Sequence, residues 1–212
     1  MDTSELIRTL ATDTRRPATP VSTAWWWAAD LAIALAAATF FAMLGPRPDI
    51  ATAAETYRFL FKFLVAITLS VSAFSCARAL SRPGENWRKV ILSLAVAPAL
   101  IAMAVVVELF ALPSDTWSAT MAGTNGFVCL TYIMLIGLGP LATFLRTLHY
   151  SAPTRPALAG AVAGLLAGGI AATFYAAQCT DDSPLFVAIW YTIAVAILAI
   201  LGAMGAGRFA RW

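Results

Sequence analysis

Residues 152–191, which read APTRPALAGAVAGLLAGGIAATFYAAQCTDDSPLFVAIWY, decide the fold of this chain. An apolar run begins at Pro156 and continues for about twenty residues, the length that a helix needs to cross a bilayer. A short polar turn with Cys179 and two aspartates follows, and a second apolar run starts at Pro184. The stretch therefore predicts a helical hairpin in a membrane, with a thiol at its tip.

The rest of the chain repeats this pattern. The chain has 212 residues, of which 60% are hydrophobic and 12% are charged, and its mean hydropathy is +0.79. Soluble domains are usually near half apolar and a quarter charged. We therefore expect an all-α polytopic membrane protein in which residues 1–22 form a polar tail and residues 23–212 form a bundle of six transmembrane helices. The expected spans are about residues 24–44, 57–79, 90–111, 126–145, 156–177 and 184–206.

Basic residues lie between the apolar runs, so the net charge of +3 does not indicate nucleic-acid binding. If the N-terminal tail is inside, eleven of the fourteen Lys and Arg residues fall on the inner side, and the other three are Arg47, Arg58 and Lys62. Because Lys and Arg are retained on the cytoplasmic side, we expect both termini to be cytoplasmic. Lys62, near the outer end of its span, is expected to extend to the lipid headgroups.

The tail contains a short amphipathic helix from Asp2 to Ala11, with Asp2 as its cap and Glu5 as the return partner. A helix this short is marginal alone in water, so it needs a surface to lie on. One interpretation is a docking peptide for a cytoplasmic protein. The other is a tail that lies on the membrane surface. The candidate docking residues are Glu5, Leu6, Ile7 and Leu10.

The predicted topology puts Cys129 and Cys179 on the outer side and Cys76 on the inner side. In a bacterium the outer side is the oxidising periplasm, where disulfides persist. The outer pair is therefore interpreted as a disulfide, as a soft-metal site with Asp181 and Asp182 as further ligands, or as two unrelated small residues in tight packing. A disulfide requires Cα atoms about 4.4–6.8 Å apart, which a sequence does not give.

Small residues recur every four positions in the fifth span, at Gly160, Gly164 and Gly168. Such a stripe lets two helix backbones approach closely within a membrane. We expect packing within the chain first and homodimer formation second. Pro98 is expected to kink the third span, where neighbouring helices tolerate it.

Motifs of enzymes and transporters are missing from the sequence. No nucleophile has an evident base partner, and there is no phosphate-binding loop and no CxxC pair, so neither an enzyme nor a bound cofactor is expected. Transporters usually carry broken or polar segments at mid-membrane in related halves. Here only Pro98, and Gly137 with Pro140, interrupt the spans. A small membrane transporter and a structural membrane protein remain the alternatives.

Four segments resemble the NrsF family, six-span inner-membrane anti-sigma factors of bacteria. They are SELIRTLATD at 4–13, TNGFVCL at 124–130, the hairpin quoted above and GRFARW at 207–212. The specific parts are APTRPALAG and C-x-x-D-S-P-L-F-V-x-x-W-Y, and the resemblance extends over essentially the whole chain.

The resemblance implies a function that composition does not. The protein would hold an extracytoplasmic-function (ECF) sigma factor at the inner membrane, away from RNA polymerase. Two periplasmic cysteines of the family match Cys129 and Cys179, and they are implicated in the response to oxidants or heavy metals. The N-terminal tail is then the candidate sigma-binding segment, with the basic loop at 80–89 as the alternative.

Overall fold

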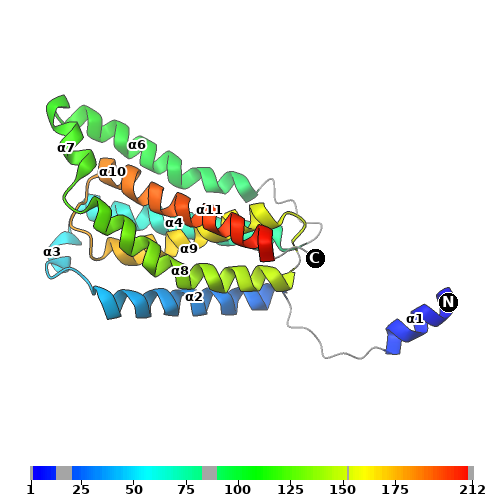
Figure 1. Cartoon of the computed structure of the whole chain (residues 1–212). Coiled ribbons are helices and arrows are strands. Elements are labelled where there is room, and N and C mark those ends of the chain that lie inside the picture. Colours follow the sequence, from blue (N-terminus) through cyan, green and yellow to red (C-terminus); the bar gives the residue numbers. More distant parts are fainter. Residues whose placement is uncertain (1, 13–20, 83–89, 152, 210–212) are drawn as a thin grey trace.

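The computed structural model describes residues 2–12, 21–82, 90–151 and 153–209 (Figure 1). These residues are mainly helical and contain no strand, which confirms the all-α class. The helices are α1 (Thr3–Thr12), α2 (Val21–Met43), α3 (Ile50–Ala53), α4 (Tyr57–Leu80), η1 (Leu92–Ala95), α6 (Val96–Ala111), η2 (Ser114–Thr116), α7 (Trp117–Ala122), α8 (Gly126–Ser151), α9 (Pro156–Ala176), α10 (Pro184–Phe186), η3 (Val187–Tyr191) and α11 (Thr192–Phe209).

Six of the helical segments described are long and apolar enough to cross a membrane, as the sequence predicts. Lipid hydrocarbon offers no hydrogen-bond partners to the backbone, and a helix pairs its own backbone N–H and C=O groups. The six segments run antiparallel to one another along the chain (Figure 1). We call the end of the bundle that carries α3, α7 and α10 the distal end. The opposite end, where α2 begins and α11 ends, is called the terminal end.

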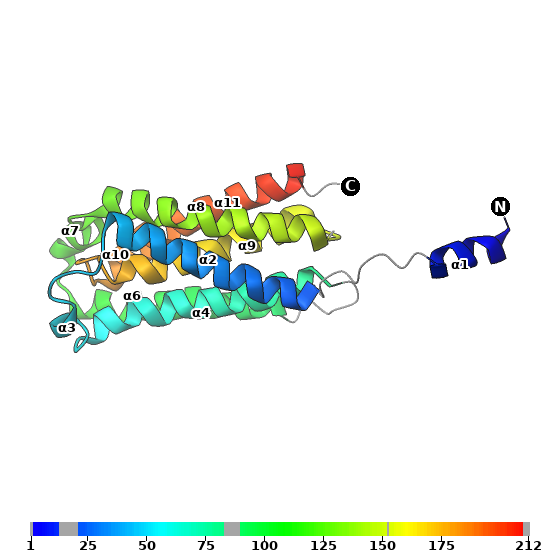
Figure 2. The same ribbon diagram turned by 90° about the horizontal axis from the view of Figure 1, so that it is seen from below.

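Helix α9 is the centre of the bundle. It packs against α11, α4, α8 and α2, and most of its residues are buried. Seen from below, α2 crosses in front of α9, between α8 and α4 (Figure 2). The position follows from composition, because a helix made largely of Ala and Gly leaves room for four neighbours to approach.

The glycines of α9 face α11. A Cβ atom added at Gly160 would overlap the backbone of Gly202, and one added at Gly164 would overlap the backbone at Leu198. At Gly168 it would lie 3.0 Å from Val195 Cγ2. The stripe is thus covered by α11 of the same chain and does not offer a free surface to a second copy.

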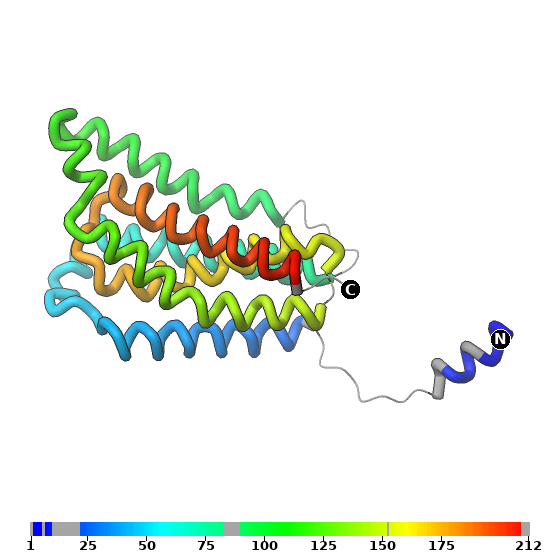
Figure 3. Tube along the Cα trace, viewed as in Figure 1, coloured from blue at the N-terminus to red at the C-terminus, as the bar shows by residue number. Residues whose placement is uncertain are grey.

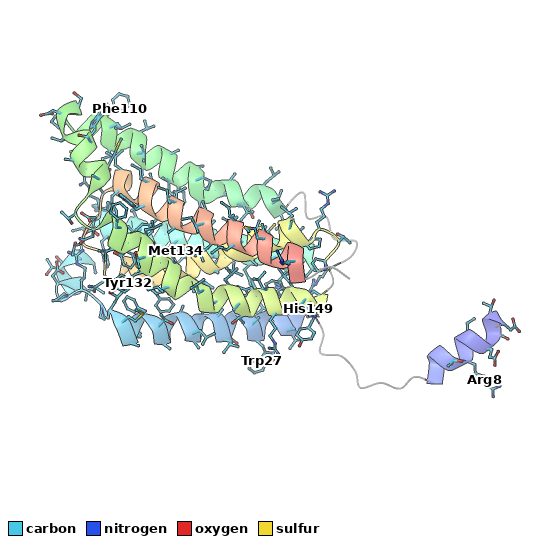
Figure 4. The ribbon with its side chains drawn as sticks, viewed as in Figure 1. Arg8, Trp27, Phe110, Tyr132, Met134 and His149 are labelled. Atoms are coloured by element: carbon cyan, nitrogen blue, oxygen red, sulfur yellow. The ribbon has the colours of Figure 1, made fainter. Side chains whose placement is uncertain are left out.

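Helix α6 lies at the edge of the bundle, against α4 and the short α10. Most of its side chains point away from the protein, and Phe110 is 90% exposed. Figure 4 shows Phe110 and Trp27 projecting outward from α6 and α2. Large apolar side chains on the outside of a bundle this long fit a lipid environment better than water.

Several local features differ from the expected spans. Helix α8 continues six residues past Leu145, to Ser151, and the short helices α3 and α7 lie in segments expected to be loops. Pro98 does not interrupt the middle of a span, because it lies in the first turn of α6, where a missing N–H is tolerated. The irregular segment is instead the 3₁₀ turn η1 just before it. A π-helical turn, η3, opens the last span.

Candidate functional site

Polar side chains converge at the distal end on the turn between α9 and α10, residues 177–183, which we call the distal turn. Figure 3 shows the chain reversing here, at the end that also carries α3 and α7. The turn forms because polar residues interrupt the apolar run and Ser183 and Pro184 then begin a new helix. The Ser183 hydroxyl accepts a hydrogen bond from the Leu185 N–H at 3.2 Å.

Lys62 of α4 reaches the distal turn from inside the bundle. Its Nζ atom donates to the Cys179 carbonyl at 2.9 Å and lies 2.5 Å from Asp182 Oδ1. The Lys62 residue is only 1% exposed. The expectation that Lys62 extends to the headgroups is therefore wrong: a carboxylate and a carbonyl inside the protein satisfy the ammonium group, so it need not leave.

Arg47, in the segment between α2 and α3, binds the other side of the turn. Its Nη1 donates to Asp182 Oδ2 at 3.1 Å, and its backbone N–H donates to the Ala177 carbonyl at 3.1 Å. It also pairs with Asp49 at 2.6 Å, and this pairing lowers the pKa of the exposed Asp49 carboxyl. Asp182 thus lies between two cations from different parts of the chain.

Asp181 binds different partners from those of Asp182, at the start of α8. Its carboxylate accepts from the backbone N–H groups of Thr124 and Asn125 at 3.3 and 3.2 Å, and from the Thr124 hydroxyl. A carboxylate at a helix N-terminus satisfies free N–H groups and is stabilised by the helix dipole. Asp181 therefore fixes the distal turn to the helix that carries Cys129.

Glu108, near the end of α6, binds the last part of the turn. Its Oε2 accepts from the Ser183 hydroxyl at 2.8 Å and from the Leu185 N–H at 2.9 Å, and its Oε1 pairs with Arg58 at 3.1 Å. Glu108 is 3% exposed, so its charge is satisfied almost entirely by the protein. Through these contacts α4, α6, the α2–α3 segment and the start of α8 all meet at one turn.

Cys129 and Cys179, the two thiols predicted to share one side of the membrane, both lie at the distal end. Cys129, in the first turn of α8, is fully buried, and Cys179, in the distal turn, is 3% exposed. They are near enough to each other, and to Tyr175 and Tyr191, to interact electrostatically. All three cysteines are free thiols, and Cys76 lies on α4 near the terminal end.

The surroundings of Cys179 control its ionisation. Burial raises the pKa of the Cys179 thiol, while the charge of Lys62 and the nearby Tyr191 hydroxyl act in the opposite direction. The thiol itself donates a hydrogen bond to the Asp181 carbonyl at 3.6 Å. Because the thiolate is the reactive form, this site holds Cys179 in a less reactive state than a free thiol.

The possible metal ligands Cys129, Cys179, Asp181 and Asp182 are not gathered around one point, because the two carboxylates bind different partners. Within the ranges described, no group of three or more His, Cys, Asp or Glu side chains is arranged to hold a metal ion. What the structure brings together is the thiol pair.

The tail residues are partly described. Helix α1 spans Thr3–Thr12, and Glu5 and Ile7 are exposed on it. The side chains of Leu6 and Leu10, and the loop at 83–89, lie outside the described residues.

Sequence reasoning missed the residues that hold the turn. Lys62 and Glu108 were visible as charges within or beside apolar spans, and ionisable groups in such positions are functional candidates by default. Arg47 carried the weaker signal of being the outer loop's only basic residue before Arg58. Tyr175 and Tyr191 carried no signal, since aromatic residues are common near membrane interfaces.

The fold and the site define a polytopic α-helical protein with a pair of enclosed thiols at one end of its bundle. The family model of NrsF, described as "Negative regulator of sigma F", matches residues 10–212. The chain therefore belongs to the NrsF family of negative regulators of sigma F.

Two relatives match this chain over its full length. It is 32% identical to "Anti-sigma-F factor NrsF" of Caulobacter vibrioides (strain NA1000 / CB15N), over 218 residues that cover all of both chains. It is also 32% identical to "Probable anti-sigma-F factor NrsF" of Azospira oryzae (strain ATCC BAA-33 / DSM 13638 / PS), again with complete coverage of both. No solved structure matches the chain.

Proposed function

We propose that this chain is an inner-membrane anti-sigma factor that holds an ECF-type sigma factor on the cytoplasmic side. It releases the sigma factor when an oxidant or a heavy metal reacts with Cys129 and Cys179. The observation that carries the proposal is that these two thiols, from α8 and the distal turn, are both buried and lie near enough to interact with each other. The names of the relatives supply a sigma factor as the partner.

The distribution of charge supports the orientation. Arg78 at the end of α4, Arg155 at the start of α9 and Arg208 at the end of α11 belong to the terminal end. Since Lys and Arg remain in the cytoplasm, the terminal end and the tail face the cytoplasm in this proposal, and the thiols face the periplasm.

The contacts of the distal turn support a route for the signal. A reaction at Cys179 moves the residue whose carbonyl binds Lys62, and whose neighbours bind α6 and the start of α8. Helices that continue to the terminal end thereby sense the change. To shift a population from 1:99 to 99:1, the stimulus must favour the released state by roughly 5.5 kcal/mol.

The tail supplies the proposed docking surface. Helix α1 exposes Ile7, an apolar side chain that is 62% accessible on a polar helix. An amphipathic helix laid in an apolar groove is a common recognition mode. We assign the sigma factor to the face of α1 that carries Glu5, Leu6, Ile7 and Leu10.

The thiol part is tested with a reporter gene that depends on the sigma factor. Cys129→Ser and Cys179→Ser, singly and together, are expected to keep repression and to lose induction by cadmium or peroxide. Cys76→Ser is the matched control, because it removes a buried thiol from the same bundle at the other end, and it should respond normally. Normal induction in the double variant would refute thiol sensing.

The proposed docking site is tested by measuring which cytoplasmic protein is recovered together with the chain. Crosslinking in unstressed cells, followed by purification and mass spectrometry, should recover a sigma factor with the full chain and lose it when residues 1–17 are deleted. Ile7→Asp should release the sigma factor, whereas Thr9→Asp, on the same short helix, should retain it. Retention after deletion would move the docking site to the loop at 80–89.

A further inference from the structure

A pocket at the distal end leads to one of the two thiols. It has a volume of about 250 Å³ and is lined by residues of α8, α9 and the distal turn, among them Val128, Tyr175, Gln178, Cys179 and Thr180. Because a water molecule takes up about 30 Å³ in the liquid, the pocket admits several water-sized molecules but no folded peptide. Thr180, at its edge, is exposed, so the pocket opens outward.

The pocket treats the two thiols differently. Cys179 forms part of its wall, while Cys129 is fully buried and does not line it. A solute that enters the pocket therefore meets Cys179 first. Cys129 is fully buried and near Cys179, so only a group already attached to Cys179 or a rearrangement of the chain can reach it.

A residue of the wall, Gln178, carries a hydrogen-bond acceptor that is buried beside the pocket. Gln178 Oε1 is buried and, within the part of the chain described, has no hydrogen-bond partner. Leaving a buried acceptor unsatisfied costs free energy, so a site of this kind favours a ligand that donates to it. The atom lies in the residue next to Cys179, and both residues line the pocket. A small solute with an O–H group satisfies this requirement.

We propose that this pocket is the access site for small hydroxyl-bearing oxidants such as hydroperoxides, that Cys179 is the thiol attacked first, and that Cys129 is the resolving thiol. The proposal rests on the thiol-sensing function above and adds the order of reaction and the class of oxidant. Gln178 orients the peroxide by turning its side-chain amide toward the pocket and accepting a hydrogen bond from the O–H group of the peroxide.

The chemistry balances in two steps. In the first, the Cys179 sulfur attacks one peroxide oxygen, an S–O bond forms and the O–O bond breaks. The thiol proton goes to the departing oxygen, which gives a sulfenic acid at Cys179 and one molecule of water from hydrogen peroxide, or of alcohol from an organic hydroperoxide. In the second, the Cys129 thiol attacks the Cys179 sulfur, an S–S bond forms, and the hydroxyl of the sulfenic acid leaves with the thiol proton as water. The dithiol loses two electrons, and the peroxide gains them.

The order of attack is tested on the purified full-length protein in detergent, with Cys76→Ser as the background. Hydrogen peroxide is added and sulfenic acid is trapped with dimedone and located by mass spectrometry. In Cys129→Ser we expect the adduct at Cys179, and in Cys179→Ser we expect almost none at Cys129. Equal adducts at the two positions, or an adduct at Cys129 alone, would overturn the proposal.

Access is tested by narrowing the mouth of the pocket. Thr180→Trp should slow the reaction of Cys179 with methyl methanethiosulfonate by about tenfold, because thiol reactivity follows exposure. Thr180→Ala, at the same position, should react at the wild-type rate. An unchanged rate in Thr180→Trp would show that solutes reach Cys179 by another path and would contradict the proposal.

Recognition is tested separately with Gln178→Met, which removes the acceptor and keeps a similar volume. One hydrogen bond of about 1 kcal/mol corresponds to a roughly fivefold slower oxidation by peroxide. Methyl methanethiosulfonate has no O–H donor, so its rate should not change. Equal effects on both reagents would contradict the role of Gln178. No sigma factor is present in these assays, so their failure is distinguishable from failure of the proposed function.

Discussion

The buried pair of Lys62 and Asp182 gives the sharpest test of how the distal turn is held. Lys62 Nζ has two partners, the Asp182 carboxylate at 2.5 Å and the Cys179 carbonyl at 2.9 Å. Asp182 has a second cation, Arg47, at 3.1 Å, and its side chain is 22% exposed, whereas that of Lys62 is not exposed at all. Replacing Asp182 therefore leaves a fully buried charge, whereas replacing Lys62 leaves a partly exposed charge that still has a partner.

Removing the carboxylate is the more costly change. Asp182→Ala leaves an ammonium group buried with one neutral carbonyl, and we expect it to cost about 3–5 kcal/mol. Lys62→Met leaves a partly exposed carboxylate that Arg47 still binds, so the loss is about 1.5–3 kcal/mol, the contribution of hydrogen bonds to a charged group. In the double variant neither charge is left alone, and we expect its cost to be at least 1 kcal/mol below the sum of the two.

The assay is unfolding by sodium dodecyl sulfate in mixed micelles, followed by tryptophan fluorescence and by far-UV circular dichroism. Asp49→Ala is the control, because it removes an ion pair to Arg47 whose carboxylate is 57% exposed, and such pairs contribute about 0–1 kcal/mol. A Lys62→Met variant that loses more stability than Asp182→Ala, or a double variant whose cost is the plain sum, would refute this account of the turn.

Three further predictions use the same unfolding assay or simple chemistry. Gly164→Ala should cost about 1–3 kcal/mol by overpacking against α11, whereas Gly207→Ala, where no atom lies within 4 Å, should be neutral or stabilise by about 0.5–1 kcal/mol. Glu108→Gln should lower the free energy of unfolding by about 1–3 kcal/mol, because a buried charged acceptor is lost. Arg58→Ala should lower it less, by about 1 kcal/mol or less, because the Arg58 side chain is 55% exposed. Burial raises the pKa of the Cys179 thiol, whereas a free thiol is half ionised near pH 8.5. The rate at which methyl methanethiosulfonate modifies Cys179 should therefore still increase with pH above about 8.5. A rate that levels off at or below that pH would contradict the prediction.

Hydropathy was enough to predict the all-α class and six helices long and apolar enough to cross a membrane. The predicted start of the fifth helix at Pro156 agrees with α9, and its predicted end at residue 177 lies one residue past Ala176. Such accuracy follows from the bilayer, which demands about twenty apolar residues per helix whatever the neighbours are. The C-terminal end of α8 and the short helix α7 were not predictable in this way, because helical turns outside the hydrocarbon do not have to meet that length.

The network around Cys179 could not be predicted, because its members are distant in sequence and depend on packing. Nothing local to Lys62 states that Asp182 lies within reach, more than a hundred residues later. A lysine near the end of a span commonly extends to the headgroups, so the general rule gave the wrong position for this residue. Only the arrangement of α4 beside α9 brings the two together.

The energies of this network bear on how a small chemical change is able to release a large partner. In the proposed function, a disulfide between Cys129 and Cys179 shifts the distal turn and breaks its hydrogen bond with Lys62. Losing the hydrogen bond from Lys62 to the Cys179 carbonyl destabilises the sigma-bound state by about 1.5–3 kcal/mol. This is less than the roughly 5.5 kcal/mol that a nearly complete switch to the released state requires. One broken contact is therefore not enough. The Asp182 pairs with Lys62 and Arg47, or the Glu108 contacts to Ser183 and Leu185, must change in the same step. The distal turn allows several contacts to change in one step, because its residues are neighbours in sequence and bind several helices at once.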